Sequence, residues 1–430
     1  MFSTRALFAG RAAVVAALVA LSPLAGAATD PRFTFTKVAD TATPIPGGGG
    51  RFADFAGEWS NTDPIAPSLD HGAAVFLGHG AGFGPDSLYG VFRFDNGVLS
   101  RVADNTMPLP GRGERILSFG TPVISGGRTA FEAISTIGRA VVVSGGDGLR
   151  TVATRGTAAP DGMGAFTDAA RPVVRGDDVW FFGRYTDGPS SGGEGVFLSR
   201  DGTLTAVAHS GTPVPGRPGE RFTSISPPRG DRGEVAFYAS GTGFNSGVYR
   251  TVGGALVRVG DGYFPDNTAI DHDGRDTSFT GRRPIDTGYS LWIDRDGTVR
   301  RIATSGDPTP DGTGHFDFSP ALVTTSVDAG HVAFTAVFDA ADNLAVFTDA
   351  GGPLTRLVGF GDRLFDKKVT NVQISQDALS GNAIAFAATF SDNTSGVYLA
   401  TLPEPAIPAF AALVLSVTLL ARPRKQGVVS

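Results

Sequence analysis

Six histidines are the side chains of this sequence best suited to acid–base or metal chemistry. They stand at His71, His79, His209, His272, His315 and His331. None of them forms an H-E-x-x-H pair or lies in a recognisable nucleophile motif. The chain contains no cysteine, which excludes thiol catalysis, thiolate zinc sites and haem attachment through cysteine. We therefore predict no catalytic residue, no cofactor site and no metal site.

The densest group of polar side chains is the run Asp271-His272-Asp273-Gly274-Arg275-Asp276. It lacks the twelve-residue ligand spacing and the terminal Glu of an EF-hand calcium loop. The run stands where other parts of the chain have a turn, so the sequence favours a solvated turn over a calcium site. Asp161-Gly162 and Asp311-Gly312 occupy one equivalent loop position, and turn chemistry accounts for them as well.

Acidic residues dominate the charge. The chain has 36 basic and 42 acidic residues, a formal net charge of −6, and residues 28–402 hold 31 basic and 41 acidic residues, hence −10. Proteins that bind nucleic acid cluster Lys and Arg against the phosphates, so we exclude nucleic acid as a partner. Paired carboxylates could serve a glycosidase or a lyase, but the sequence places no pair at a catalytic separation.

These side chains are carried by a repeat whose signature ends in phenylalanine. Gly127-Arg128-Thr129-Ala130-Phe131 recurs as Gly233-Glu234-Val235-Ala236-Phe237 and as Gly330-His331-Val332-Ala333-Phe334. The repeated aromatic positions, on average about 52 residues apart, are Phe76, Phe131, Phe181, Phe237, Phe279, Phe334 and Phe386. Seven copies on one period indicate a repeat fold. We interpret these phenylalanines as structural residues buried between neighbouring units.

A tight hairpin follows the phenylalanine signature. Gly90-Val91-Phe92 leads through Asn96-Gly97 to Leu99, and Gly195-Val196-Phe197 leads through Asp201-Gly202 to Leu204. The Asx-Gly pairs supply the positive φ angles that such turns require. Each repeat therefore offers four strands and a Pro-Gly loop. In one unit, the strands are expected near 222–227, 234–239, 247–251 and 256–260.

Four strands repeated seven times predict an all-β fold, a seven-bladed β-propeller of four-stranded blades. The last repeat supplies only three strands and ends with a segment at about 396–402. The missing fourth strand is present at the N-terminus, at about 33–40. We expect these two segments to pair and close the ring, because an open array would expose unpaired edge groups. Phe35 must then lie close to Tyr398.

The repeats resemble those of bacterial tandem-repeat proteins named for an NxxGxxAF pattern. Glycine stands at the expected place in four units, and phenylalanine in all seven, whereas the leading Asn is missing from every copy. The four glycines are Gly72, Gly127, Gly233 and Gly330. The resemblance covers nearly all of the chain between its two ends. That family carries no established activity, so the resemblance implies no catalytic residues.

The N-terminus is organised like a secretory signal peptide. Arg5 and Arg11 precede an apolar run at 12–21, and a small-residue site with Ala25 and Ala27 follows. The apolar run holds about ten residues, too few to span a bilayer. We predict cleavage after Ala27 and export of the rest.

The C-terminus carries a second candidate targeting signal, in which a short motif precedes an apolar stretch at 406–421 and a basic cluster. The motif and cluster residues are Pro403, Glu404, Pro405, Arg422, Arg424 and Lys425. This tail resembles the PEP-CTERM sorting signals of Gram-negative bacteria, which exosortases recognise. The resemblance implies a short transmembrane segment, a membrane-anchored intermediate, and transfer to the cell surface or an extracellular polysaccharide matrix. A plain C-terminal anchor is the alternative.

The sequence thus divides into a signal peptide (1–27), a propeller domain (28–402), a sorting signal (403–425) and a tail (426–430). We expect a non-enzymatic scaffold that binds a polysaccharide or protein partners. Exosortase and the secretion machinery are its expected partners during export, and the membrane is contacted only transiently. The alternative is a carbohydrate-active enzyme of the envelope, with carboxylates and an aromatic platform at the propeller channel.

Overall fold

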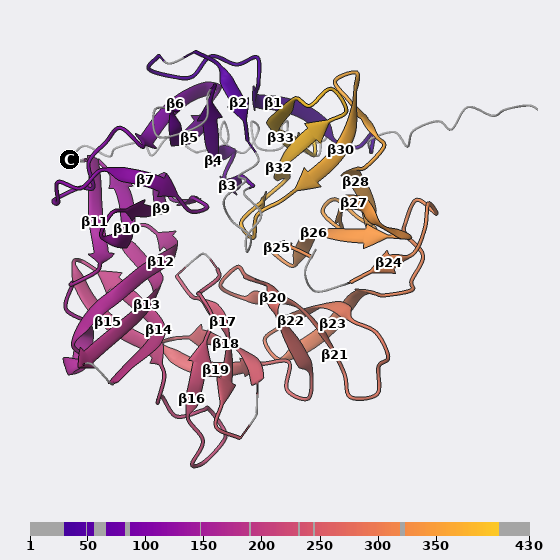
Figure 1. Cartoon of the computed structure of the whole chain (residues 1–430). Coiled ribbons are helices and arrows are strands. Elements are labelled where there is room, and N and C mark those ends of the chain that lie inside the picture. The colour runs from indigo at the N-terminus through magenta and orange to yellow at the C-terminus, as the bar shows by residue number, and fades with distance from the viewer. Residues whose placement is uncertain are drawn as a thin grey trace, which may run out of the picture.

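The computed structural model describes residues 30–403, except 49, 56–65, 82–86, 147, 189–190, 231–232, 244–245 and 319–322. Its strands form seven antiparallel sheets arranged around a centre as the blades of a propeller (Figure 1). This confirms the all-β class and the seven repeats. One 3-10 turn, η1 (Pro160–Gly162), stands between blades 2 and 3. None of the helical segments in these ranges is long and apolar enough to cross a membrane.

The predicted signal peptide, with Ala25 and Ala27, lies outside the described residues, and so does the predicted sorting tail after Pro403.

Three blades have one continuous first strand. Blade 3 consists of β12 (Ala165–Arg175), β13 (Asp178–Gly188), β14 (Ser191–Arg200) and β15 (Thr203–His209). Blade 4 consists of β16 (Phe222–Ile225), β17 (Ala236–Gly241), β18 (Ser246–Val252) and β19 (Ala255–Val259). Blade 5 consists of β20 (Phe264–His272), β21 (Asp276–Arg282), β22 (Ser290–Arg295) and β23 (Thr298–Thr304).

In the other blades, the first strand is split into short segments that pair with one second strand. Blade 1 consists of β2 (Phe52–Asp54), β3 (Ser68–Asp70), β4 (Ala73–Gly80), β5 (Tyr89–Asp95) and β6 (Val98–Asp104). Blade 2 consists of β7 (Ile116–Phe119), β8 (Val123–Ser125), β9 (Arg128–Ser135), β10 (Gly138–Gly145) and β11 (Gly148–Thr154). Blade 6 consists of β24 (Phe316–Asp317), β25 (Thr325–Asp328), β26 (His331–Phe338), β27 (Ala340–Thr348) and β28 (Thr355–Gly359).

Blade 7 is completed by the N-terminal strand. Its own strands are β29 (Arg363–Leu364), β30 (Lys367–Gln373), β31 (Leu379–Ser380), β32 (Ala383–Phe390) and β33 (Ser395–Thr401). Strand β1 (Thr34–Asp40) pairs antiparallel with β33, with Thr34 opposite Thr401 and Lys37 opposite Tyr398. Figure 1 shows the indigo start of the chain beside its yellow end. The predicted closure is confirmed.

The repeated phenylalanines form the centre of the blades. Each lies on the second strand of its blade and is at most 1% exposed. In five blades, this ring stacks on an aromatic ring of the third strand with centroids 5.6 to 6.3 Å apart, in the pairs Phe76–Phe92, Phe181–Phe197, Phe237–Tyr249, Phe334–Phe347 and Phe386–Tyr398. Burial of each Phe contributes about 1.5–3 kcal/mol.

Alternate residues of the same strands join neighbouring blades. Leu77 and Val91 of blade 1 share a core with Phe131 and Val142 of blade 2. Because side chains along a strand point to opposite faces in turn, each blade buries one face against the preceding blade and the other against the following one. The first strands lie nearest the centre, as β3 and β25 do in Figure 1, and those of blades 5, 6, 7, 1, 2 and 3 contact one another in this order.

Candidate functional site: the central channel

The first strands carry polar side chains that accept hydrogen bonds from the backbone of the next blade. Ser68 Oγ accepts from the N–H of Ile124 at 3.2 Å, and Asp70 Oδ2 accepts from Gly126 at 2.7 Å. These two bonds tie blade 1 to blade 2 near the centre of the ring, and each spans 56 residues of sequence.

The same arrangement recurs in blades 5, 6 and 7. Between blades 5 and 6, Asp271 and Asp273 accept from Val327 at 2.8 Å and Ala329 at 2.7 Å. We call the acceptors of these bonds the inner belt; its members are Ser68, Asp70, Asp271, Asp273, Ser326, Asp328 and Ser380.

Two further junctions complete the described belt. Ser326 accepts from Leu379 at 3.0 Å, and Asp328 accepts from Gly381 at 2.6 Å. Ser380 accepts from His71 at 3.0 Å, which joins blade 7 to blade 1. The belt was not among the features predicted from the sequence. A Ser-x-Asp or Asp-x-Asp motif that recurs just before the phenylalanine strand, at Ser68, Asp271 and Ser326, is the signal that could have revealed it.

The acidic run at 271–276 contributes to this belt; it forms the predicted turn, between β20 and β21, but the prediction that its carboxylates are solvated is wrong. Asp271, Asp273 and Asp276 are each at most 2% exposed. Asp273 Oδ1 accepts from the N–H of Asp276 at 2.6 Å, and Asp276 pairs with Arg295 at 2.6 Å. The carboxylates remain buried because backbone donors and an arginine satisfy them. No group of three or more metal-ligating side chains stands together within the described ranges.

Four charged residues from four blades interact near the channel: Arg171, Arg229, Asp271 and Asp377. Burial lowers the pKa of Arg229, and the negative charges of Asp377 and Asp271 oppose this effect. Burial and then the positive charge of Arg229 lower the pKa of Arg171 to about 10. Burial raises the pKa of Asp377 to about 6, although Arg229 favours its charged form. We call these four residues the channel charge cluster.

Backbone irregularities position the cluster. Arg171 lies in a bulge of β12, where the pairing with β13 shifts between Ala170 and Val173, and its φ is 52°. Arg229 forms an isolated bridge with Ala236 just before β17. Asp377 lies between β30 and β31, and its carbonyl accepts from the N–H of Leu69 at 2.7 Å. Three of the four members therefore lie where a regular strand is interrupted, whereas Asp271 lies in the paired part of β20.

His272 is the buried histidine of this region. Its side chain is fully buried, with Nδ1 2.9 Å from the carbonyl oxygen of Asp276 and Nε2 4.0 Å from Glu234 Oε2. Within the described part of the chain, Nε2 has no hydrogen-bond partner. Burial lowers the pKa of His272 to about 4, so the ring is neutral at physiological pH.

The other five histidines lie apart on separate elements. The side chains of His71, His315 and His331 are 89%, 64% and 51% exposed, and each is near one Asp. His79 stacks on Tyr89 with centroids 4.0 Å apart, and His209 Nδ1 lies 2.7 Å from the carbonyl oxygen of Ser210. The structure thus gathers none of the six histidines into one site.

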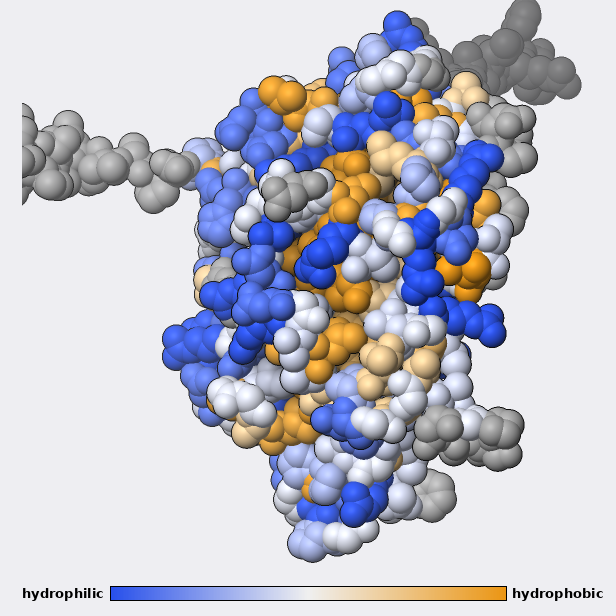
Figure 2. Space-filling view, turned by 90° about the vertical axis from the view of Figure 1, so that its left-hand side faces the viewer, coloured by the Kyte–Doolittle hydropathy of each residue, from blue (hydrophilic) through white to orange (hydrophobic). Residues whose placement is uncertain are grey.

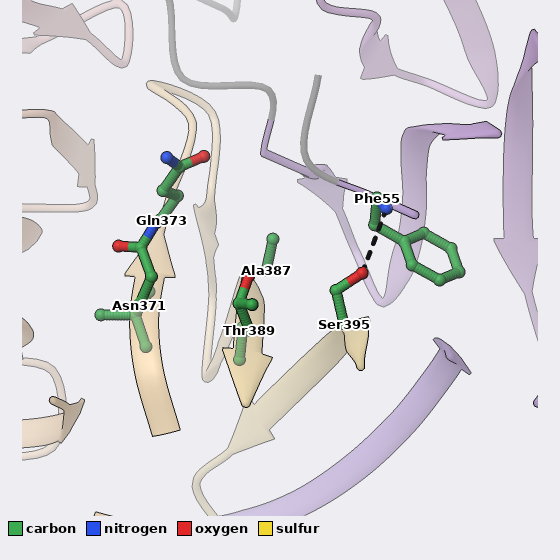
Figure 3. A pocket seen from close by; sticks show the side chains of 8 residues that line it. Phe55, Asn371, Gln373, Ala387, Thr389 and Ser395 are labelled. Atoms are coloured by element: carbon green, nitrogen blue, oxygen red, sulfur yellow. Dashed lines mark hydrogen bonds between the residues drawn. The ribbon is translucent and has the colours of Figure 1, made fainter. Parts of the chain in front are cut away.

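A small pocket opens between blade 7 and blade 1. Its empty volume is about 220 Å³ including open solvent. Ser395 Oγ accepts from the N–H of Phe55 at 3.3 Å on one wall (Figure 3). Its described lining is Phe55, Asn371, Val372, Gln373, Ala387, Ala388, Thr389 and Ser395. These side chains include no ionisable group.

On the outer surface, apolar side chains lie mostly among hydrophilic ones. Seen from the side of β10, β11 and β15, apolar atoms show in the middle of the face and hydrophilic residues border them (Figure 2). Among the described residues, the large hydrophobic side chains with substantial exposure are Val98, Leu117, Val252, Val257, Ile285, Phe360 and Phe365. Phe360 and Phe365 are close in sequence and flank the start of blade 7.

A protein-family model matches residues 9–256, more than half of the chain. The protein belongs to the Family of unknown function (DUF7453). The match covers β1 and extends into blade 4 of this DUF7453 protein. No curated protein matches its sequence significantly.

Solved structures similar to the DUF7453 protein include the β-propeller domain of the Trilobed protease from Pyrococcus furiosus, at 9% identity, TM-score 0.46, and coverage of 84% of this chain and 99% of that one. Pyrococcus horikoshii acylaminoacyl peptidase matches at 10% identity, TM-score 0.48, and coverage of 85% and 54%. This chain thus spans about half of that peptidase. Polysaccharide lyase Uly1 matches at 11% identity, TM-score 0.45, and coverage of 85% and 98%. These similarities concern the fold and carry no argument about activity.

Proposed function

We propose that this DUF7453 protein is an exported propeller scaffold at the cell surface or in an extracellular matrix. There it binds a polysaccharide or a protein and catalyses no reaction. The observation that carries the proposal is the use of the channel carboxylates. Asp70, Asp271, Asp273 and Asp328 each accept a hydrogen bond from the backbone of the next blade. Such bonds fix each carboxylate in place and engage its oxygens in holding neighbouring blades together.

The position of the chain ends supports the export part of the proposal. The ring is sealed by β1 and β33, and Pro403 follows the end of β33 by two residues. The proposed signal peptide at 1–27 and the proposed exosortase signal at 403–425 thus flank the sealed domain. Neither is needed to complete a blade, so their removal leaves every described sheet intact.

Cell fractionation tests this proposal. The full chain and a variant that lacks residues 403–430 are expressed in a Gram-negative host that has an exosortase. We expect the full chain, shortened at both ends, in the surface or matrix fraction and the truncated variant in the periplasm or medium. Retention of both proteins in the cytoplasm with an intact N-terminus would refute export.

The channel charge cluster favours a second candidate, a carbohydrate-active enzyme of the envelope. The pKa of Asp377 is raised to about 6, and a group that titrates near the working pH suits general acid–base catalysis. The test measures new reducing ends released from polygalacturonate and from dextran by the wild type and by Asp377→Asn. Release that the substitution abolishes would favour the enzyme; no release by the wild type favours the scaffold.

A further inference from the structure

The hairpin between β29 and β30 turns through an unusual pair of residues. Phe365 and Asp366 both have left-handed backbone, with φ of 49° and 64°. In every other pair of consecutive left-handed residues in the described ranges, such as Asn96-Gly97 and Asp296-Gly297, the second residue is glycine. A residue with a side chain costs roughly 1–2 kcal/mol in this region. An Asn-Gly pair at these two positions would therefore give a more stable fold than Phe-Asp does.

The turn holds an aromatic ring at the surface. Phe365 is 49% exposed, and one face of its ring stacks on Tyr398 with centroids 5.5 Å apart and 26° between the planes. Phe360, also partly exposed, lies on the other side of β29, and the ammonium of Lys368 is 5.8 Å from its ring centroid. Two exposed rings and a cation thus gather around one short hairpin.

The described lysines are concentrated at the same place. The chain contains four lysines, Lys37, Lys367, Lys368 and Lys425. The three described ones belong to blade 7: Lys37 is the cross-strand partner of Tyr398, and the other two begin β30. They stand out because the propeller domain carries a net charge of −10.

Some of the basic side chains around this hairpin have no carboxylate partner among the described residues and can pair with a ligand. Lys37 pairs with Asp40 at 2.8 Å, and Lys367 pairs with Asp392 at 3.0 Å. Arg363 and Lys368 are exposed, and no carboxylate of a described residue pairs with either of them. The guanidinium of Arg363 donates to the carbonyl oxygen of Asp366 at 2.9 Å, which directs it toward the turn.

We infer that Phe360, Arg363, Phe365 and Lys368, here called the Phe365 site, bind an acidic polysaccharide. The C–H face of a sugar ring can pack on the exposed ring of Phe365, while the two cations pair with the acidic groups of the polymer. The inference rests on the proposed scaffold function and names its ligand class. Each exposed ion pair contributes little, so the affinity must come from several contacts along a polymer.

Substitution of the two turn residues can test binding without impairing folding. Phe365→Asn with Asp366→Gly installs the Asn-Gly pair that the chain uses at Asn96-Gly97. We expect an equal or higher melting temperature and at least a tenfold loss of affinity for polygalacturonate, measured with the purified full-length protein by affinity electrophoresis. Unchanged affinity in a folded variant would overturn the site. Ile285→Asn, which replaces another exposed apolar side chain (81%), is the control and should bind as the wild type does.

Three polymers test the ligand class. Polygalacturonate carries carboxylates, dextran sulfate carries sulfates, and dextran is neutral. Retention of the wild type on either charged polymer, weakened by Lys368→Gln and by salt, supports the inference. Equal retention on dextran, or no retention on any polymer, overturns it. Cell fractionation tests export separately. A failure to bind these polymers would therefore refute the Phe365 site without refuting the proposed export.

Discussion

His272 shows how one buried side chain couples stability to pH. The unfolded chain binds a proton on this histidine at about pH 6.5, whereas burial lowers its pKa in the folded protein to about 4. Between these values the unfolded state holds more protons, so the free energy of unfolding rises with pH. The stability from a neutral His272 is complete above pH 6.5 and is lost as the pH falls toward 4.

Urea unfolding of the wild type and of His272→Asn measures this coupling. Between pH 7 and pH 4.5 the wild type should lose roughly 2.4 kcal/mol more than the variant. Asp377, with its pKa raised to about 6, acts in the opposite sense in both proteins, and the comparison cancels its effect. His315→Asn, at an exposed histidine (64%), is the control and should keep the wild-type pH profile. A His272→Asn profile parallel to the wild type would contradict the account.

The inner belt also predicts that the loss of a single serine hydroxyl lowers the free energy of unfolding. Ser326→Ala removes the acceptor of the buried N–H of Leu379. An unsatisfied buried donor costs about 1–3 kcal/mol, and we expect this loss in the free energy of unfolding. Ser100→Ala, at an exposed serine whose Oγ donates to the carbonyl oxygen of Arg93, should change it by less than about 0.5 kcal/mol. Equal effects of the two substitutions would show that the belt adds no stability.

Among the elements, the strands that recur in every repeat were predictable from the sequence, whereas the bulges and breaks that interrupt them were not. The strands of blade 4 were expected at 234–239 and 247–251 and lie at Ala236–Gly241 and Ser246–Val252. The bulge in the outer strands was not predicted. In blade 1 the pairing shifts between Val91 and Phe92, where Val102 of β6 is the extra residue; the alternating pattern of apolar residues does not mark such a bulge.

The candidate site was less predictable than the fold. Arg171, Arg229 and Asp377 have no shared motif, and each lies where a first strand is bulged or broken. Their proximity is set by the closed ring, which brings together residues up to about 200 positions apart. The strain at Phe365 was equally hidden, because Leu-Phe-Asp-Lys contains a single residue that favours turns, Asp366, and lacks the glycine of the other tight hairpins.

For the whole molecule, closure by β1 should limit stability, and a disulfide can test this in a chain without cysteine. Thr34 and Thr401 are directly opposed in the sealing pair. A disulfide from Thr34→Cys and Thr401→Cys would close almost the entire domain into one loop, which stabilises by roughly 2–5 kcal/mol. We expect this gain in guanidinium unfolding of the oxidised protein, and its loss on reduction. The single Thr34→Cys variant should unfold like the wild type.

The place of β33 within blade 7 has a mechanical consequence. Because β33 lies between β32 and β1, a load applied through Pro403 pulls on an interior strand held by two ladders of hydrogen bonds. Extraction of that strand requires both ladders to rupture in shear, whereas an edge strand would peel away from a single neighbour. A propeller tethered by this end would resist drag better than one whose last strand stood at the rim.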